Sequence, residues 1–248
     1  MTVTLFPTKH ALVRKLESTF TLADDERHAL LNLPMQLSKL GPGQTIVREG
    51  THLSRSCVLL EGFACSYKAT GYGKRQILAF NIPGDIVDLH GLHLEVLDNS
   101  VGTITPCTVG YVPHEILRDL CGRYPRIAAA LWRGTLVDAA IFREWLINVG
   151  RREASVRIAH LLCEMLVRLR AVGLAEGYSC DLPITQGQIA DALALTSVHV
   201  NRVLQALRAD GLIDLKGNRL SVPDWDKLRK AGDFDPTYLH LERVHATA

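Results

Sequence analysis

The stretch that decides the fold of this chain is ITQGQIADALALTSVHVNRVLQALRADGLI, which covers residues 184–213. Thr185 and Gln188 have the spacing of a capping box, in which a hydroxyl and a side-chain amide satisfy the first unpaired N–H groups of a helix. Thr196 is a second N-cap residue, and Asp210-Gly211 is a typical helix end. Two short helices joined by a turn of this length predict a helix-turn-helix.

The apolar residues of the same stretch agree with this prediction. Two helices that cross closely need a small residue at the crossing, and Ala190 supplies it. Val200 begins the apolar stripe of the second helix and is expected to fill the facing hole.

The opposite, polar side of the second helix predicts a role in reading DNA, because the N-terminal half of such a helix contacts base edges in the major groove. Arg202 can bind guanine through two hydrogen bonds, Asn201 can pair with adenine, and Val198 can pack on a thymine methyl group. The expected base-reading residues are Ser197, Val198, Asn201 and Arg202.

A hairpin follows the second helix and predicts the wing of a winged helix-turn-helix. Residues 212–222, LIDLKGNRLSV, alternate as two short strands around a glycine turn, and the tip carries two cations suited to the DNA backbone. The expected phosphate-contacting residues are Thr185, Thr196, His199, Lys216 and Arg219.

Upstream, the apolar period is helical from about residue 123 to 149. One stripe recurs at steps of three and four and is the expected dimer interface: Ile127, Ala130, Gly134, Val137, Ile141 and Trp145. Further apolar residues surround the helix, which predicts that it packs both on its own domain and on a second subunit. The alternative is a core helix inside a monomer.

The region before this helix, residues 41–112, is rich in glycine and β-branched residues and predicts a small β-roll. Strands are expected at 45–47, 57–60, 64–68, 76–80 and 103–112. The expected organisation is a sensor roll over 1–122, a dimerisation helix over 123–150 and a DNA-binding domain over 151–248.

Composition excludes several classes of protein. The chain has 248 residues, of which 47% are hydrophobic and 22% charged, as in globular proteins with substantial cores. The sequence contains no long apolar run and no signal-peptide layout, so we expect a cytoplasmic protein with no membrane partner. The 28 basic and 26 acidic residues nearly balance, and DNA binding is therefore inferred from the local motif alone.

The sequence gives no sign of catalytic or metal chemistry. The six cysteines are scattered without a CxxC pair, and nucleophile-elbow, phosphate-loop and HExxH motifs are absent, so we expect no enzyme activity, no metal and no cofactor. An enzyme, or a signalling adaptor that binds only protein, remains a competing function, and DNA retardation assays discriminate both from a DNA-binding protein.

The whole layout resembles the bacterial Crp/Fnr family of transcription regulators. The matching segments are GQTIVREG (43–50), LLEG (59–62), PGDI (83–86), NVGRR (148–152) and RIAHLL (157–162), together with the helix-turn-helix. The resemblance implies an α+β fold with a cyclic-nucleotide-binding-type β-roll, a long dimerisation helix and a C-terminal winged helix-turn-helix. It also implies a homodimer on a pseudo-palindromic promoter site, with RNA polymerase as a further partner. Val198 stands where the family usually has a glutamate.

The family's cyclic-nucleotide binders use a glutamate and an arginine-serine pair, whose places are taken here by Leu89 and by Asn99-Ser100. Because the cation and the carboxylate are missing, we expect an effector other than cyclic AMP. The DLHGLH segment with Asp88, His90 and His93 is an alternative source of haem or metal ligands. A further alternative is constitutive binding, or redox control through Cys180, which is expected to be exposed in the loop before the helix-turn-helix.

Overall fold

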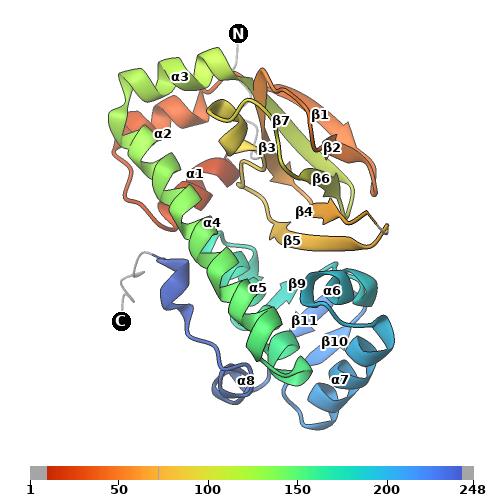
Figure 1. The fold of residues 1–248 in the computed structure, drawn as a ribbon. Helices are drawn as coiled ribbons and strands as arrows, with labels where there is room; N and C mark the ends of the chain where they lie inside the picture. The colour runs from red at the N-terminus through yellow and green to blue at the C-terminus, as the bar shows by residue number, and fades with distance from the viewer. Residues whose placement is uncertain (1–9, 72, 242–248) are drawn as a thin grey trace. The chain divides into compact units, whose positions relative to one another are not determined.

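The computed structural model describes residues 10–71 and 73–241 (Figure 1). Its described residues form two compact units. One contains the residues up to Ser66, those from Phe80 to Asp138, and those from His240 on; the other contains Tyr67–Ala79 and Ala139–Leu239. None of the helices in the described part of the chain combines the length and the apolar character that a bilayer crossing demands.

The first half of the chain is mainly β-structure with a few short helices. Its helical elements are α1 (His10–Glu17), α2 (Asp24–Leu31), the 3-10 turn η2 (Leu89–Leu92) and α3 (His114–Arg123). Its strands are β1 (Gln36–Leu40), β2 (Thr45–Val47), β3 (Arg55–Glu61), β4 (Ala64–Ala69), β5 (Arg75–Asn81), β6 (Ser100–Thr103) and β7 (Cys107–Pro113). They form one sheet in the order β1-β7-β3 and a second in the order β2-β6-β4-β5.

Strand β3 is buried on both of its faces. Cys57 and Leu59 belong to one apolar cluster, and Val58 and Leu60 belong to another that includes residues of α1, α2 and α3. Successive side chains of a strand point to opposite sides, so a strand between two cores needs an uninterrupted apolar run. This explains why residues 57–60 show no alternation of apolar and polar residues.

Two glycines in the turns of the roll are required by the backbone. Gly62 has a φ of +88° and Gly84 has a φ of +102°, a region that residues with a side chain rarely adopt. A β-carbon on Gly62 would also collide with the carbonyl oxygen of Pro106, and one on Gly84 would collide with the carbonyl oxygen of Ala11. These turns are the LLEG and PGDI segments singled out in the sequence.

The expected strand at 103–112 is two strands, because β6 ends at Thr103 and β7 begins at Cys107. The connection contains Pro106, which has no N–H group for a strand ladder. The long helix is confirmed as α4 (Pro125–Arg151), whose first residue is a proline, as is common at that position.

The second half of the chain begins with α5 (Ala154–Ala171) and contains the helix-turn-helix. The elements that follow α5 are β8 (Ala175–Glu176), β9 (Ser179–Asp181), α6 (Gln186–Leu193), α7 (Ser197–Ala209), β10 (Asp214–Lys216), β11 (Arg219–Ser221), α8 (Trp225–Ala231) and the 3-10 turn η3 (Pro236–Leu239). The four strands form a sheet in the order β10-β11-β9-β8. Helix α5 packs against α6, α7 and α8 and is the centre of this part of the fold.

A buried polar network centred on Glu164 of α5 joins α5 to the C-terminal half of α4 and to η3. The Glu164 carboxylate is fully buried and accepts hydrogen bonds from Trp145 Nε1 at 3.0 Å and from the Tyr238 hydroxyl at 2.9 Å. Arg168 Nη1 lies 3.3 Å from its other oxygen. His160 lies 3.1 Å from the Tyr238 hydroxyl through Nε2, and its Nδ1 lies 3.0 Å from the Gly232 carbonyl oxygen.

Candidate nucleic-acid interface

Helices α6 and α7 begin as the sequence predicts. Thr185 Oγ1 accepts a hydrogen bond from Gln188 N at 3.2 Å, and Gln188 Oε1 accepts one from Thr185 N at 2.8 Å, which completes the capping box. Thr196 Oγ1 accepts a hydrogen bond from His199 N at 3.2 Å at the start of α7. Both helix starts are therefore fixed by threonines that are themselves among the expected phosphate contacts.

The crossing of the two helices is also as expected. Ala190 and Val200 are both buried, and the connection turns through Ala194, whose φ of +54° places it in the left-handed region. Leu195 N donates a hydrogen bond to the Ala190 carbonyl oxygen at 3.1 Å and closes the turn. Figure 1 shows α6 and α7 as consecutive helices beside the strands β10 and β11.

The expected base-reading residues lie on one side of α7, because positions i, i+1, i+4 and i+5 share a helix face. Ser197, Val198 and Arg202 are exposed, and Val198 keeps 72% of its surface accessible although it is apolar. Asn201 is half-buried, and its Nδ2 donates a hydrogen bond to Gln186 Oε1 at 3.1 Å. The opposite side of α7 is buried through Val200, Val203, Leu204 and Leu207.

Gln186 is a residue that the sequence interpretation did not single out. It is the first residue of α6, directly after the N-cap Thr185, and it is half-buried. Its position on the helix that packs against α7 is the signal that could have identified it.

The expected phosphate-contacting residues are exposed, and most already have partners in the chain. The hydroxyls of Thr185 and Thr196 act as helix caps, and His199 is exposed in the first turn of α7. On the wing, Lys216 Nζ lies 2.8 Å from Asp214 Oδ2, and Arg219 Nη1 lies 3.4 Å from Asp181 Oδ1. Ion pairs as exposed as these are weak, because the solvent screens them.

Cys180 does not lie in an exposed loop, and this corrects the expectation from the sequence. It belongs to β9, pairs with Leu220 of β11 and is 1% exposed. Burial, together with the neighbouring Asp181 carboxylate, raises the pKa of the Cys180 thiol to about 11. A buried thiol that remains protonated is a poor target for oxidants, so the structure argues against a redox switch at this residue.

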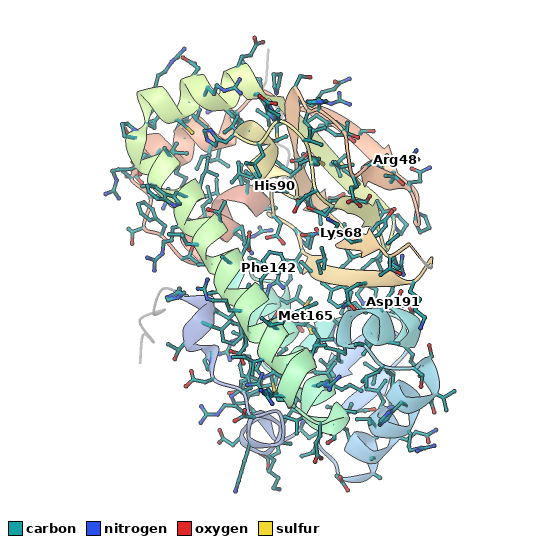
Figure 2. The ribbon with its side chains drawn as sticks, in the orientation of Figure 1. Arg48, Lys68, His90, Phe142, Met165 and Asp191 are labelled. Carbon is teal, nitrogen blue, oxygen red and sulfur yellow. The ribbon has the colours of Figure 1, made fainter. Side chains whose placement is uncertain are left out.

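In the roll, the places that the resemblance to the Crp/Fnr family assigns to cyclic-nucleotide ligands carry other chemistry. Leu89 lies in η2, the Asn99 amide donates to the Ser100 carbonyl oxygen, and Ser100 Oγ accepts a hydrogen bond from Glu49 N at 3.0 Å. Within residues 10–71 and 73–241, no three histidine, cysteine or acidic side chains gather in a way that could hold a metal ion. The DLHGLH segment, in which Figure 2 labels His90, therefore gains no support as a metal site.

Asp88 of the DLHGLH segment is instead a buried structural carboxyl group. It is 1% exposed, and its Oδ1 accepts a hydrogen bond from Cys57 N at 2.7 Å. Burial is the main cause that raises the pKa of Asp88 to about 7, from an ordinary value of 3.8.

Asp88→Asn should therefore remove part of the dependence of stability on pH. A raised carboxyl pKa means that the folded state binds the proton more tightly, so the stability that Asp88 contributes is complete below pH 3.8 and is lost as the pH rises through about 7. Between pH 6 and pH 8 the parent should lose about 1.4 kcal/mol more than Asp88→Asn, which keeps the oxygen acceptor for Cys57. Chemical unfolding at several pH values measures this difference, and identical pH slopes for the two proteins would contradict it.

Helix α4 shows two apolar sides with different surroundings. Of the six residues expected at the dimer interface, Gly134 is half-buried. The other five are buried by their own chain: Ile127, Ala130, Val137, Ile141 and Trp145. Ile127 and Ala130 pack in the core of the roll, and Trp145 bonds to Glu164. This stripe is filled by the protomer itself, so it is not available to a second chain.

A second stripe of α4 remains uncovered and is called here the outer stripe. Its members recur at steps of three and four residues, and each is exposed or half-buried: Trp132, Thr135, Ala139, Phe142, Leu146 and Val149. Trp132 is 69% exposed and Leu146 is 74% exposed. Figure 2 labels Phe142 in the middle of the helix. This 3.5-residue period is the pattern of a two-stranded coiled coil.

Comparisons with known proteins match both halves of the chain. The pattern of a cyclic nucleotide-binding domain matches residues 37–124, and that of a Crp-like helix-turn-helix domain matches residues 156–231. The transcriptional activator protein FnrL of Cereibacter sphaeroides is 30% identical over 85% of this chain and 86% of its own. The electron transport regulator A of Shewanella oneidensis is 24% identical over 84% of this chain and 83% of its own. The structure of FixK2 from Bradyrhizobium japonicum has a TM-score of 0.72 and 26% identity, and it covers 80% of this chain and 98% of that one.

Proposed function

The chain belongs to the Crp/Fnr family of DNA-binding transcription regulators, and from this premise we propose how it engages DNA. Two copies bind a pseudo-palindromic promoter site, and their α7 helices enter successive major grooves about 34 Å apart. The observation that carries this proposal is the outward face of α7, where Ser197, Val198 and Arg202 are exposed on a helix whose opposite side is buried.

The chemistry of this face supports a division of labour among its residues. The Arg202 guanidinium offers two parallel donors to guanine O6 and N7, and the Asn201 amide offers the acceptor and donor that adenine requires. Val198, an exposed apolar side chain, suits a thymine methyl group. Lys216 and Arg219 on the wing, with the caps of α6 and α7 and His199, contact phosphates and set the register of the helix on the duplex.

The homodimer is proposed on the outer stripe of α4. Six exposed or half-buried residues lie at coiled-coil spacing, and five of them, including Trp132 and Leu146, are apolar; together they leave an apolar surface of the kind that marks protein interaction sites. A second α4, packed parallel or antiparallel, would cover this surface. A two-fold axis along parallel helices would place the two α7 helices symmetrically, as a palindromic site requires. The relatives act as transcription regulators rather than enzymes, and RNA polymerase in the bacterial cytoplasm is the proposed further partner.

We propose that the effector of the roll is not cyclic AMP. Leu89 and Asn99-Ser100 offer neither a carboxylate for a ribose hydroxyl nor a cation for a cyclic phosphate. The Ser100 hydroxyl and the Asn99 amide already have main-chain partners. A binding assay in which cyclic AMP has micromolar affinity for the chain would overturn this proposal.

Arg202→Ala should weaken binding to a DNA site selected by the parent protein by about 1–3 kcal/mol for each half-site. The loss should concentrate at one guanine, because the two hydrogen bonds to guanine O6 and N7 disappear. Fluorescence anisotropy with the selected site and with single-base variants measures both the affinity and the preference.

Arg208→Ala is the matched control for this experiment, since Arg208 is also exposed on α7 but lies near its C-terminal end. It should lower the affinity for all sequences by a similar small amount and leave the base preference unchanged. If Arg202→Ala retained the parent's preference at every base pair, the assignment of α7 as the reading helix would be contradicted.

A further inference from the structure

The contact between Gln186 and Asn201 joins the two helices of the helix-turn-helix at the end that faces DNA in the proposed function. Asn201 Nδ2 donates to Gln186 Oε1 at 3.1 Å, and both side chains are half-buried. The first turns of α6 and α7 lie close together here, because a β-carbon built on Gly187 would be 4.0 Å from Ser197 Oγ. The bond therefore connects two capped helix starts rather than two mobile loops.

This bond restricts the Asn201 amide. A carboxamide carries one acceptor oxygen and two N–H donors, and Gln186 takes one of those donors. One N–H and the oxygen Oδ1 remain, and together they make the donor and acceptor pair that adenine N7 and the adenine N6 amino group require. While Gln186 Oε1 faces Asn201, a rotation that exchanged the oxygen and nitrogen of the Asn201 amide would bring two oxygens together and lose this bond.

We propose that Gln186 is a positioning residue for base recognition: it holds the Asn201 amide in the orientation that selects adenine. The inference rests on the proposed function, since it requires that α7 enters the major groove. Gln186 itself reads no base. It acts by removing alternative orientations of Asn201 before DNA arrives, so that the ordering of this side chain is not required at the moment of binding.

The test uses the full chain, a DNA duplex selected by the parent protein, and the set of single-base variants of that duplex. Gln186→Ala should reduce the preference at one base pair of each half-site by about two- to tenfold, because the freed Asn201 side chain must be ordered on binding. Asn201→Ala should reduce the preference at the same base pair, and the double variant should lose no more than Asn201→Ala alone. Affinity for non-selected DNA should change by less than about twofold in Gln186→Ala, because that binding is set by phosphate contacts.

Gln186→Glu provides the matched variant, because a carboxylate oxygen still accepts the Asn201 N–H. It should weaken binding to every sequence, since it adds negative charge beside the DNA, but it should keep the parent's pattern of base preference. A structural role of Gln186 alone would not produce this separation between affinity and preference.

The outcomes distinguish the inference from the function on which it rests. If Asn201→Ala loses the preference at one base pair and Gln186→Ala keeps it, the positioning role is overturned while the reading role of α7 stands. If Gln186→Ala weakens all sequences equally, the positioning role is overturned as well. If Asn201→Ala changes no base preference, the reading role of Asn201 fails, and this inference fails with it.

Discussion

Leu146→Asp should convert the protein from a dimer to a monomer and lower its affinity for the selected DNA site by about a hundredfold or more. Leu146 is 74% exposed in the protomer and lies in the outer stripe of α4, where the proposed second helix would cover it. An aspartate there would place two unpaired carboxylates in an apolar interface, and each would lose its hydration without gaining a partner. A monomer also lacks the second α7 helix, and the linkage of two binding modules raises the overall affinity by about 10²- to 10⁴-fold.

Sedimentation or light scattering measures the oligomeric state, and anisotropy measures the affinity for the same DNA. Ile147→Asp is the matched control, because Ile147 is a neighbouring exposed apolar residue that lies outside the outer stripe. It should leave the dimer intact. A Leu146→Asp protein that is still dimeric and binds the palindromic site like the parent would remove the basis for the proposed interface.

Glu164→Ala should lower the free energy of unfolding of the C-terminal part of the chain by about 3–5 kcal/mol, the cost of breaking a buried ionic contact. The Glu164 carboxylate is the common acceptor for Trp145 and Tyr238, and it pairs with the buried Arg168. Removal of the carboxylate breaks the ion pair with Arg168 and takes away the oxygen that accepts from the buried Trp145 indole and from the half-buried Tyr238 hydroxyl.

Chemical unfolding followed by circular dichroism and by tryptophan fluorescence checks this expectation, since Trp145 of the network is one of the three tryptophans of the chain. Glu176→Ala is the matched control, since Glu176 is 92% exposed in its side chain and pairs with Arg219 at 3.6 Å. Its effect should stay within about 0.5 kcal/mol. Equal unfolding midpoints for Glu164→Ala and Glu176→Ala would show that the network adds no stability.

The helix-turn-helix could be predicted from the sequence because its determinants are local. The caps at Thr185 and Thr196 and the small residue Ala190 act within a few residues of one another, and each is confirmed in the structure. The wing follows the same rule, since its turn requires only a glycine, Gly217, with a positive φ of 59°.

Features that depend on tertiary packing could not be predicted in this way. Helix α4 carries apolar residues on two sides, and periodicity alone does not tell which side its own chain covers. The sequence interpretation therefore placed the dimer interface on the stripe of Ile127 and Trp145, which the protomer buries. Cys180 was misplaced for the same reason, since the three-residue strand β9 around it is defined by its pairing with β11 and not by its own sequence.

Strand β1 escaped prediction altogether. Its sequence, QLSKL, has few apolar residues, and both ends of the strand are exposed or half-buried. It forms because it pairs along its whole length with β7, from Gln36 opposite Tyr111 to Leu40 opposite Cys107. A pattern of five residues does not reveal that a segment pairs with a strand about 70 residues further along the chain.

The ion pairs of the two wing cations affect the expected salt dependence of DNA binding. Lys216 and Arg219 already form ion pairs, with Asp214 and Asp181 respectively, in the protein without DNA. When DNA binds, a phosphate would replace the Asp214 or Asp181 carboxylate beside the cation. The displaced carboxylates would then attract cations from the solution. The binding of these cations would offset part of the entropy gained when DNA releases its condensed counterions. The wing would therefore contribute less to the salt dependence of DNA binding than its two positive charges suggest.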